Sequence, residues 1–173
     1  AVESSEDARI FSSAVLAGFD VIVFLNTSGT VLDAAQRAAF QRFVQSGRGY
    51  VGVHCASCTE LEWPWYGGLV GAYFDAHPPV QPVEVVVEDT EHPATRALPA
   101  RFVWTDEWYG FRQNPRPNVR VLLSVDESSY RPVEGAMGDD HPIAWCHEYD
   151  GGRAFYTALG HEAPSYFGPL LVA

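Results

Sequence analysis

Apolar runs of strand length alternate with an amphipathic helical pattern in the first third of the chain. Residues 20–25 and 49–53 are nearly continuous apolar runs, which is typical of strands buried on both faces. Between them, residues 33–46 repeat apolar side chains at helical spacing, and Asp33 with Gln36 makes a capping-box pattern at the start. This strand–helix–strand order predicts a right-handed parallel βαβ unit.

Shorter elements are predicted in the rest of the chain. Further strands are expected over residues 83–88 (a candidate edge strand), 101–105, 118–125, 141–149 and 153–159. The last two form a predicted antiparallel hairpin, because Asp150, Gly151 and Gly152 between them are a strong turn signal. Helices are expected within residues 3–17 and over 69–74 and 164–171.

Composition and charge narrow the classes of protein that fit this pattern. The chain has 173 residues, of which 47% are hydrophobic, enough for one globular domain. Its formal net charge of −11 argues against nucleic acid and anionic membranes as partners. The sequence has no apolar run near the ~18 residues that a membrane-spanning helix needs. Lysine is absent, which excludes a Schiff-base lysine.

Polar side chains stand where several apolar runs end. They are His54, the adjacent pair Asp106 and Glu107, and His161. Strand ends gather at one edge of an α/β sheet, so groups distant in sequence can converge there. Histidine paired with a carboxylate suits acid–base chemistry near neutral pH, and the same set suits a divalent metal such as zinc. The alternative for each residue is a hydrogen-bonded structural role.

Aromatic side chains cluster near these positions. Trp63, Trp65 and Tyr66 form one group, and Tyr109 belongs to a second. Such clusters usually belong to a core. Tryptophan and tyrosine beside acids and histidines also line clefts that bind sugars.

The remaining histidines differ in their surroundings. His77 follows the first aromatic group and is therefore a further site candidate. His92 and His141 each precede a proline and are expected in turns. His147 alternates within a predicted strand, which favours a structural role.

Cys55 and Cys58 have the C-x-x-C spacing of thioredoxin-like redox sites. Their neighbours lack the Trp-Cys-Gly-Pro character of such sites, so a short-loop disulfide or a pair of small structural residues is favoured over redox catalysis. A disulfide would favour a secreted protein slightly. Residues 52–56 also resemble a nucleophile elbow. His54 holds the presented position and Cys55 is one place late, which argues against amidotransferase chemistry.

Several of these segments together resemble the ThuA-like family, the trehalose-utilisation proteins with a class I glutamine amidotransferase-like fold. The matching segments are residues 19–26 (FDVIVFLN), 50–54 (YVGVH), 63–67 (WPWYG), 105–109 (TDEWY), 141–145 (HPIAW) and 160–161 (GH). They span nearly the whole chain, and jointly they are specific.

The resemblance implies a fold and a site. The implied fold is a flavodoxin-like three-layer α/β/α sandwich with a mostly parallel sheet. The implied site is a cleft at the strand ends that holds His54, Glu107 and His161, with His77 nearby. The family also implies a link to carbohydrate metabolism, with sugars or oxidised (3-keto) glycosides as ligands.

The chain departs from the family pattern in two respects. Family members begin with a strand and a Gly-Phe-Arg-His-type segment, whereas this sequence starts after that point. We therefore expect a single ThuA-like domain over residues 1–173, truncated at both ends and lacking its first strand. The second departure is the pair Cys55 and Cys58, where the family more often has small or acidic residues.

The leading hypothesis is a carbohydrate-processing enzyme in which His54, Glu107 and His161 are catalytic. The expected substrate-binding residues are Trp63, Trp65, Tyr66, His77, Asp106 and Tyr109. A second hypothesis is a non-catalytic carbohydrate-binding or interaction module that uses the same cleft. A third is a metal-binding protein with His54, His77 and His161 as ligands.

Overall fold

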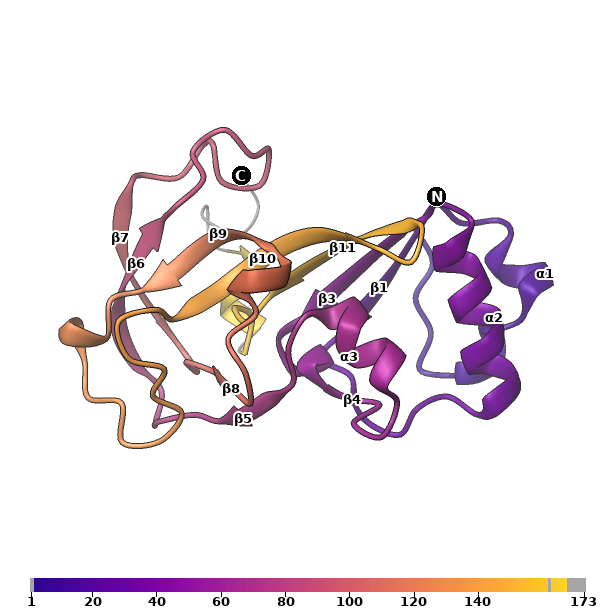
Figure 1. The fold of residues 1–173 in the computed structure, drawn as a ribbon, viewed down its shortest axis with the longest axis horizontal. Coiled ribbons are helices and arrows are strands. Elements are labelled where there is room, and N and C mark those ends of the chain that lie inside the picture. The colour runs from indigo at the N-terminus through magenta and orange to yellow at the C-terminus, as the bar shows by residue number, and fades with distance from the viewer. Residues whose placement is uncertain (1, 162, 168–173) are drawn as a thin grey trace.

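A seven-stranded sheet forms the centre of the molecule (Figure 1). The computed structural model describes residues 2–161 and 163–167. The strand order is β1-β3-β11-β10-β9-β6-β7. In that order the strands are Val21–Leu25, Gly49–Val53, Gly152–Thr157, Pro142–Tyr149, Arg120–Val125, Gln81–Val87 and Arg101–Asp106.

The parallel part of the sheet consists of β1, β3 and β11. Val53 at the end of β3 lies opposite Leu25 of β1 and Thr157 of β11. The other pairings, from β11 through β10, β9 and β6 to β7, are antiparallel. The predicted βαβ unit and the β10–β11 hairpin are both confirmed, and the sheet as a whole is mixed.

The alternating directions place the end of β7 at the same edge as the ends of β3 and β11. Three antiparallel steps separate β10 from β7, so β7 runs in the direction of β11. Figure 1 shows β6 and β7 turned away from the direction of β3 and β11, as expected for a strongly twisted sheet. This curl brings the end of β7 back towards the loop after β11, where Asp106 accepts a hydrogen bond from the main chain of Gly160.

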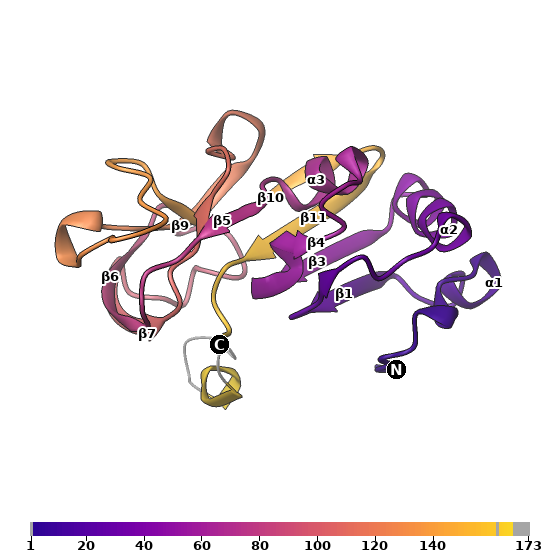
Figure 2. The same cartoon turned by 90° about the horizontal axis from the view of Figure 1, so that it is seen from below.

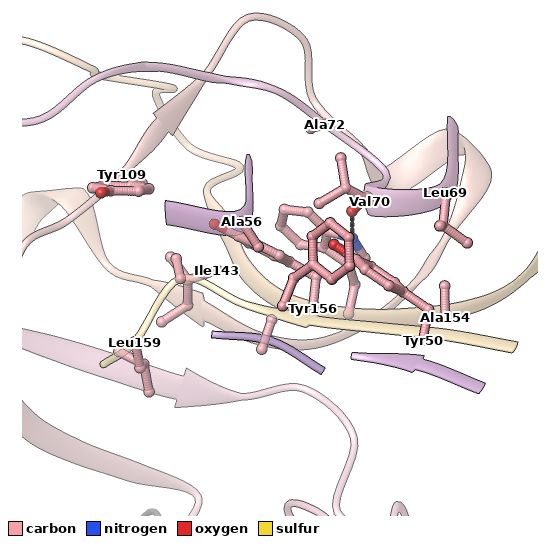
Figure 3. Close-up of a cluster of buried hydrophobic side chains, with 14 of the residues drawn as sticks. Tyr50, Ala56, Leu69, Val70, Ala72, Tyr109, Ile143, Ala154, Tyr156 and Leu159 are labelled. Atoms are coloured by element: carbon pink, nitrogen blue, oxygen red, sulfur yellow. Dashed lines mark hydrogen bonds between the residues drawn. The ribbon is translucent and has the colours of Figure 1, made fainter. Parts of the chain in front are cut away.

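Helices α2 (Ala34–Gln45) and α3 (Pro64–Val70) cover one face of the parallel strands (Figure 2). The predicted helix at α2 is confirmed, including the reciprocal capping box between Asp33 and Gln36. The short helix α1 (Ser13–Leu16) packs beside α2. Under α3 lies an aromatic core, in which Tyr50 and Tyr156 pack against Leu69 and Val70 (Figure 3).

The predicted helix over residues 69–74 is wrong in its position. The helix starts earlier, at Pro64, and ends at Val70, because Gly71 follows with a left-handed φ of 94°. A side chain at Gly71 would collide with the indole nitrogen of Trp145. Beyond this turn the chain forms β5 (Phe74–Ala76), which pairs with β8 (Gly110–Phe111).

The candidate edge strand over residues 83–88 lies inside the sheet. This strand, β6, is paired on both sides, by β9 and by β7. Its alternate residues Val83, Val85 and Val87 are buried. Among the described residues, β1 and β7 are the outer strands.

The second face of the sheet carries less of the described chain. Val21, Val23 and Leu25 of β1 are about half exposed there, at 46%, 55% and 56%. The segment η5 (Ala163–Phe167) lies on this side (Figure 2). It covers the start of the helix predicted over residues 164–171, and the rest of that helix lies outside the described residues.

Small elements complete the described fold. They are η1 (Ala8–Ile10), β2 (Ser28–Gly29), η2 (His54–Ser57), β4 (Cys58–Thr59), η3 (Arg116–Asn118) and η4 (Glu127–Ser129). The described helices include none with the length and hydropathy needed to cross a membrane.

Candidate functional site

His54 occupies a sharp turn directly after β3. Its φ is 50°, a left-handed value that is uncommon for residues other than glycine. Two hydrogen bonds stabilise the turn, because the Tyr156 hydroxyl and the Ser57 hydroxyl both donate to the His54 carbonyl, at 2.9 and 3.2 Å. The elbow-like turn that the sequence suggested therefore presents an imidazole.

The orientation of the His54 ring is fixed by the loop after β11. The side chain is 1% exposed, and its Nδ1 lies 2.6 Å from the main-chain oxygen of Ala158. A carbonyl oxygen only accepts, so Nδ1 must carry the hydrogen and, in the neutral ring, Nε2 has a lone pair. Tyr109 packs on the other side of the ring, with centroids 4.1 Å apart. The Nε2 atom is therefore an acceptor, and it lies 3.3 Å from a carboxylate oxygen of Glu107.

Glu107 lies at the centre of a group of imidazoles. Its Oε2 is 3.3 Å from Nε2 of His54 and 3.2 Å from Nδ1 of His161. Its Oε1 is 3.5 Å from Nε2 of His77. The Glu107 side chain is 15% exposed, whereas His77 and His161 are each about one-third exposed. The cluster is thus buried at His54 and more exposed at the other two histidines.

Asp106 holds two parts of this site together. Its carboxylate, 2% exposed, accepts from the main-chain nitrogens of Gly160 at 2.9 Å and His161 at 3.1 Å. It also accepts from the main-chain nitrogen of Glu107 at 2.9 Å. Expected from sequence to bind substrate, Asp106 lies behind the cleft, where it positions Glu107 and His161.

His77 is oriented by its own neighbour. Its Nδ1 lies 2.9 Å from the carbonyl oxygen of Pro78, so this nitrogen donates and Nε2 points towards Glu107. The ring lies against Tyr109, with centroids 5.8 Å apart. The sequence placed His77 near the site, and the structure brings it to the carboxylate.

The first aromatic group is not brought to the cleft. Tyr66 is fully buried, and its hydroxyl contacts the Tyr50 hydroxyl and the Ala56 carbonyl at 2.7 and 2.9 Å. The indole of Trp65 donates to Asp150 at 2.7 Å, in the turn that precedes β11, whereas His161 follows β11.

Trp63 belongs to this same group. It stacks on Trp65 at 4.9 Å, and the guanidinium of Arg37 lies 5.4 Å from its ring. Of the four aromatic residues expected to bind substrate, Trp63, Trp65, Tyr66 and Tyr109, only Tyr109 packs against His54 in the described structure.

Both cysteines of the C-x-x-C sequence are free thiols in the structure, so of the two alternatives left open by the sequence the disulfide is not formed there. The Cys55 sulfur lies 3.2 Å from the Tyr109 hydroxyl. A hydrogen bond between the two thiols lowers the pKa of Cys55 and raises that of Cys58, because they share one proton. Burial raises the pKa of Tyr109 well above its ordinary value.

Two residues that hold the site in place were not predicted from the sequence as site residues. His141 is buried, with Nε2 2.9 Å from the Tyr109 carbonyl and Nδ1 2.7 Å from a Glu127 oxygen. It therefore anchors the main chain of the tyrosine that packs on His54. Asn26 donates from its side chain to the Gly160 carbonyl at 3.2 Å. Its position directly after the strand at residues 20–25 was the available signal.

The site has the composition of a metal-binding cluster. One ligand atom from each of His54, Glu107 and His161 lies within 4.8 Å of the others. The set expected from sequence differed in one member, since it contained His77 in place of Glu107.

A separate cavity of about 270 Å³ lies against other residues of the sheet. Its lining is mainly apolar and includes Phe102, Trp104, Leu122 and Phe155. None of the three clustered residues His54, Glu107 and His161 lines it. The cavity is therefore distinct from the polar cleft.

The fold and the cleft define an α/β domain with a histidine–glutamate–histidine site at its strand ends. The family model described as ThuA, trehalose utilisation, matches residues 1–172. The chain belongs to the ThuA family. No curated protein matches it.

Solved structures support the same fold. A ThuA-like protein from Bacteroides uniformis ATCC 8492 is 32% identical, with a TM-score of 0.80 over 97% of this chain and 72% of its own. A ThuA-like protein from Parabacteroides merdae ATCC 43184 is 20% identical, with a TM-score of 0.72 over 86% of this chain and 62% of its own. The predicted flavodoxin-like α/β fold is thereby confirmed.

A more distant likeness concerns the fold alone. A β-galactosidase from Bacillus circulans sp. alkalophilus is 13% identical, with a TM-score of 0.56. The match covers 82% of this chain and 20% of that enzyme.

Proposed function

We propose that this chain is an enzyme that processes a sugar or an oxidised (3-keto) glycoside in the cleft formed by His54, Glu107 and His161. Membership of a family described as trehalose utilisation supports a carbohydrate-related role. The observation that carries the proposal is the position of the His54 Nε2 atom, which is held as an acceptor 3.3 Å from the Glu107 carboxylate. A fixed neutral imidazole beside a carboxylate is suited to moving protons near neutral pH.

Each residue has a role that its surroundings support. His54 takes a proton at Nε2, and the resulting imidazolium is stabilised by the Glu107 carboxylate and the Ala158 carbonyl. His161, on the open side of the cleft, exchanges protons with the substrate or with water. In a 3-keto glycoside the keto group acidifies the adjacent carbon–hydrogen bond. Removal of that proton by Nε2 leaves the electron pair on the keto oxygen as an enolate.

The proposal is tested by hydrogen exchange at that carbon. A methyl 3-keto-glucoside is incubated with the protein in D₂O, and deuterium uptake and product formation are followed by NMR. His54→Ala and Glu107→Gln are expected to reduce the exchange rate by roughly 100- to 10,000-fold. His92→Ala, in a loop outside the cleft, serves as the matched control and is expected to keep the full rate.

The contrary result separates this proposal from the binding-module alternative. Calorimetry with the same sugar and with trehalose measures binding without chemistry. Binding with no exchange, unchanged by His54→Ala, would favour a non-catalytic module. Full exchange in both His54→Ala and Glu107→Gln would remove these residues from the mechanism.

A further inference from the structure

We propose that His54, Glu107 and His161 together bind a divalent metal ion, with zinc the best chemical match. The inference rests on the proposed function, because it assigns a cofactor to the same site. With the ion bound, Nε2 of His54 would be a ligand, and a water held at the open fourth position would take the substrate proton in its place. Two imidazole nitrogens and one carboxylate are ligands that zinc accepts, and three protein ligands leave a fourth position open for water or substrate. The three ligand atoms lie within 4.8 Å of one another.

The first argument for a metal site is the hydrogen bond that orients the His54 ring. Metal-binding histidines commonly donate their second ring nitrogen to a carbonyl or carboxylate, which fixes the tautomer and points the other nitrogen at the metal. His54 has this arrangement, since Nδ1 lies 2.6 Å from the Ala158 oxygen. Its left-handed backbone, with φ at 50°, aims the ring into the cleft at a conformational cost.

The second support is an unsatisfied atom. Nε2 of His54 belongs to a side chain that is 1% exposed, and it lacks a hydrogen-bond partner among the described residues. Glu107 Oε2 is 3.3 Å away, but the contact is not aligned as a hydrogen bond. Buried polar atoms are normally satisfied, so an orphaned acceptor facing two other ligand atoms indicates a missing partner. A cation between them would supply it.

The third support is the spacing. In a tetrahedral site with bonds of about 2.0–2.1 Å, neighbouring ligand atoms are about 3.3 Å apart. The Glu107 oxygen lies 3.3 Å from the His54 nitrogen and 3.2 Å from the His161 nitrogen. Two of the three ligand pairs therefore have the spacing of a tetrahedral site, and the two imidazole nitrogens lie within 4.8 Å of each other.

The surrounding residues hold the ligands in place. Asp106 fixes the main chain of both Glu107 and His161 through three accepted hydrogen bonds. His77 lies 3.5 Å from the second oxygen of Glu107 and so orients the carboxylate from the open side. We assign His77 as a positioning residue, in contrast to the sequence-based set that made it a ligand.

The experiment measures metal directly. The full chain is treated with EDTA, dialysed, and titrated with zinc chloride by calorimetry, with the bound metal counted by elemental analysis. We expect one equivalent of zinc. The isosteric Glu107→Gln and the more exposed His161→Ala are expected to weaken binding at least tenfold, and His77→Ala and the control His92→Ala to keep one equivalent. Circular dichroism verifies that each variant is folded.

The outcomes separate this inference from the proposed function. Less than about one-tenth of an equivalent bound, or affinity unchanged in both Glu107→Gln and His161→Ala, overturns the metal site. Sugar turnover that persists in metal-free protein would then leave the acid–base function standing. One equivalent of zinc lost in both variants, with no turnover of any sugar tested, supports the metal site and counts against the enzyme.

Discussion

The Nδ1 atom of His54 lies 2.6 Å from the main-chain oxygen of Ala158, so the loop after β11 decides which nitrogen of this imidazole faces Glu107. The two residues are 104 positions apart in the sequence. Because β3 and β11 are adjacent parallel strands, their carboxyl ends bring the pair together. The chemistry of the cleft therefore depends on a main-chain contact between neighbouring strand ends.

This contact makes a prediction about the tautomer of His54. At a pH where the ring is neutral, the hydrogen is expected on Nδ1, because the carbonyl can only accept. Long-range ¹H–¹⁵N spectra of labelled protein distinguish the two nitrogens, and His54→Gln assigns the signals. A hydrogen found on Nε2 would contradict the structure at this point.

Asp106 is expected to contribute to stability as well as to the site. Asp106→Asn should lower the free energy of unfolding by about 1–3 kcal/mol, because an amide nitrogen replaces one oxygen that accepts a buried main-chain hydrogen. Urea denaturation provides the measurement. Asp75→Asn, at an exposed position, is the matched control and should change stability by less than about 0.5 kcal/mol. Equal effects at the two positions would show that the hydrogen bonds accepted by Asp106 do not stabilise the fold.

The thiol of Cys55 is expected to react as a thiolate at neutral pH. The hydrogen bond from Cys58 lowers its pKa, so the rate of iodoacetamide alkylation should change little between pH 6 and 8. Cys146 is the internal control, because burial raises its pKa and its rate should rise about tenfold per pH unit.

Replacing the donor tests the cause of this reactivity. In Cys58→Ala the pKa of Cys55 should rise, and its alkylation should become as dependent on pH as that of Cys146. Mass spectrometry of peptides identifies which cysteine has reacted. A profile for Cys55 that is steep in the natural sequence would show that the thiols do not share a proton.

Gly71 and Gly29 form a matched pair for the turn after α3. Both have left-handed φ values, 94° and 74°, but a side chain at Gly29 meets nothing within 4 Å, whereas one at Gly71 collides with Trp145. Gly29→Ala should cost about 1–2 kcal/mol of unfolding free energy, from the backbone alone. Gly71→Ala should cost at least about 2 kcal/mol more, because the collision displaces the indole that donates to Val70. Similar losses would show that the Trp145 contact is unimportant.

The sequence predicted correctly those elements whose start, end and apolar face depend only on residues within the element. The helix α2 was predicted because its capping box and apolar face lie within its own residues. The helix expected over residues 69–74 was misplaced, because α3 already ends at Val70, where Gly71 follows with a left-handed φ. A side chain at Gly71 would also collide with Trp145, which lies on a distant strand, so part of the requirement for glycine is set by tertiary structure.

The residues of the candidate site likewise include some that could be predicted from the sequence and others that could not. The positions of His54, Glu107 and His161 after strands were visible in the sequence, since side chains that follow strands can meet at one edge. The positions of Trp65 and Tyr66, which were expected to bind substrate, could not be predicted from the sequence. In the structure Trp65 donates to Asp150 and Tyr66 lies in the core. The role of His141 depends on the approach of a distant loop to Tyr109, for which the sequence held no signal.

The curl of the sheet has a consequence for the order in which the candidate site forms during folding. Asp106 is the last residue of an outer strand, β7, yet its bonds to Gly160 and His161 close loops of 54 and 55 residues. Such long-range closures form late, because the entropy of the intervening chain opposes them until neighbouring strands are in place. Species in which β7 has not yet joined the sheet would contain folded βαβ structure but no assembled centre. Assembly of the candidate site during refolding should therefore lag behind recovery of secondary structure.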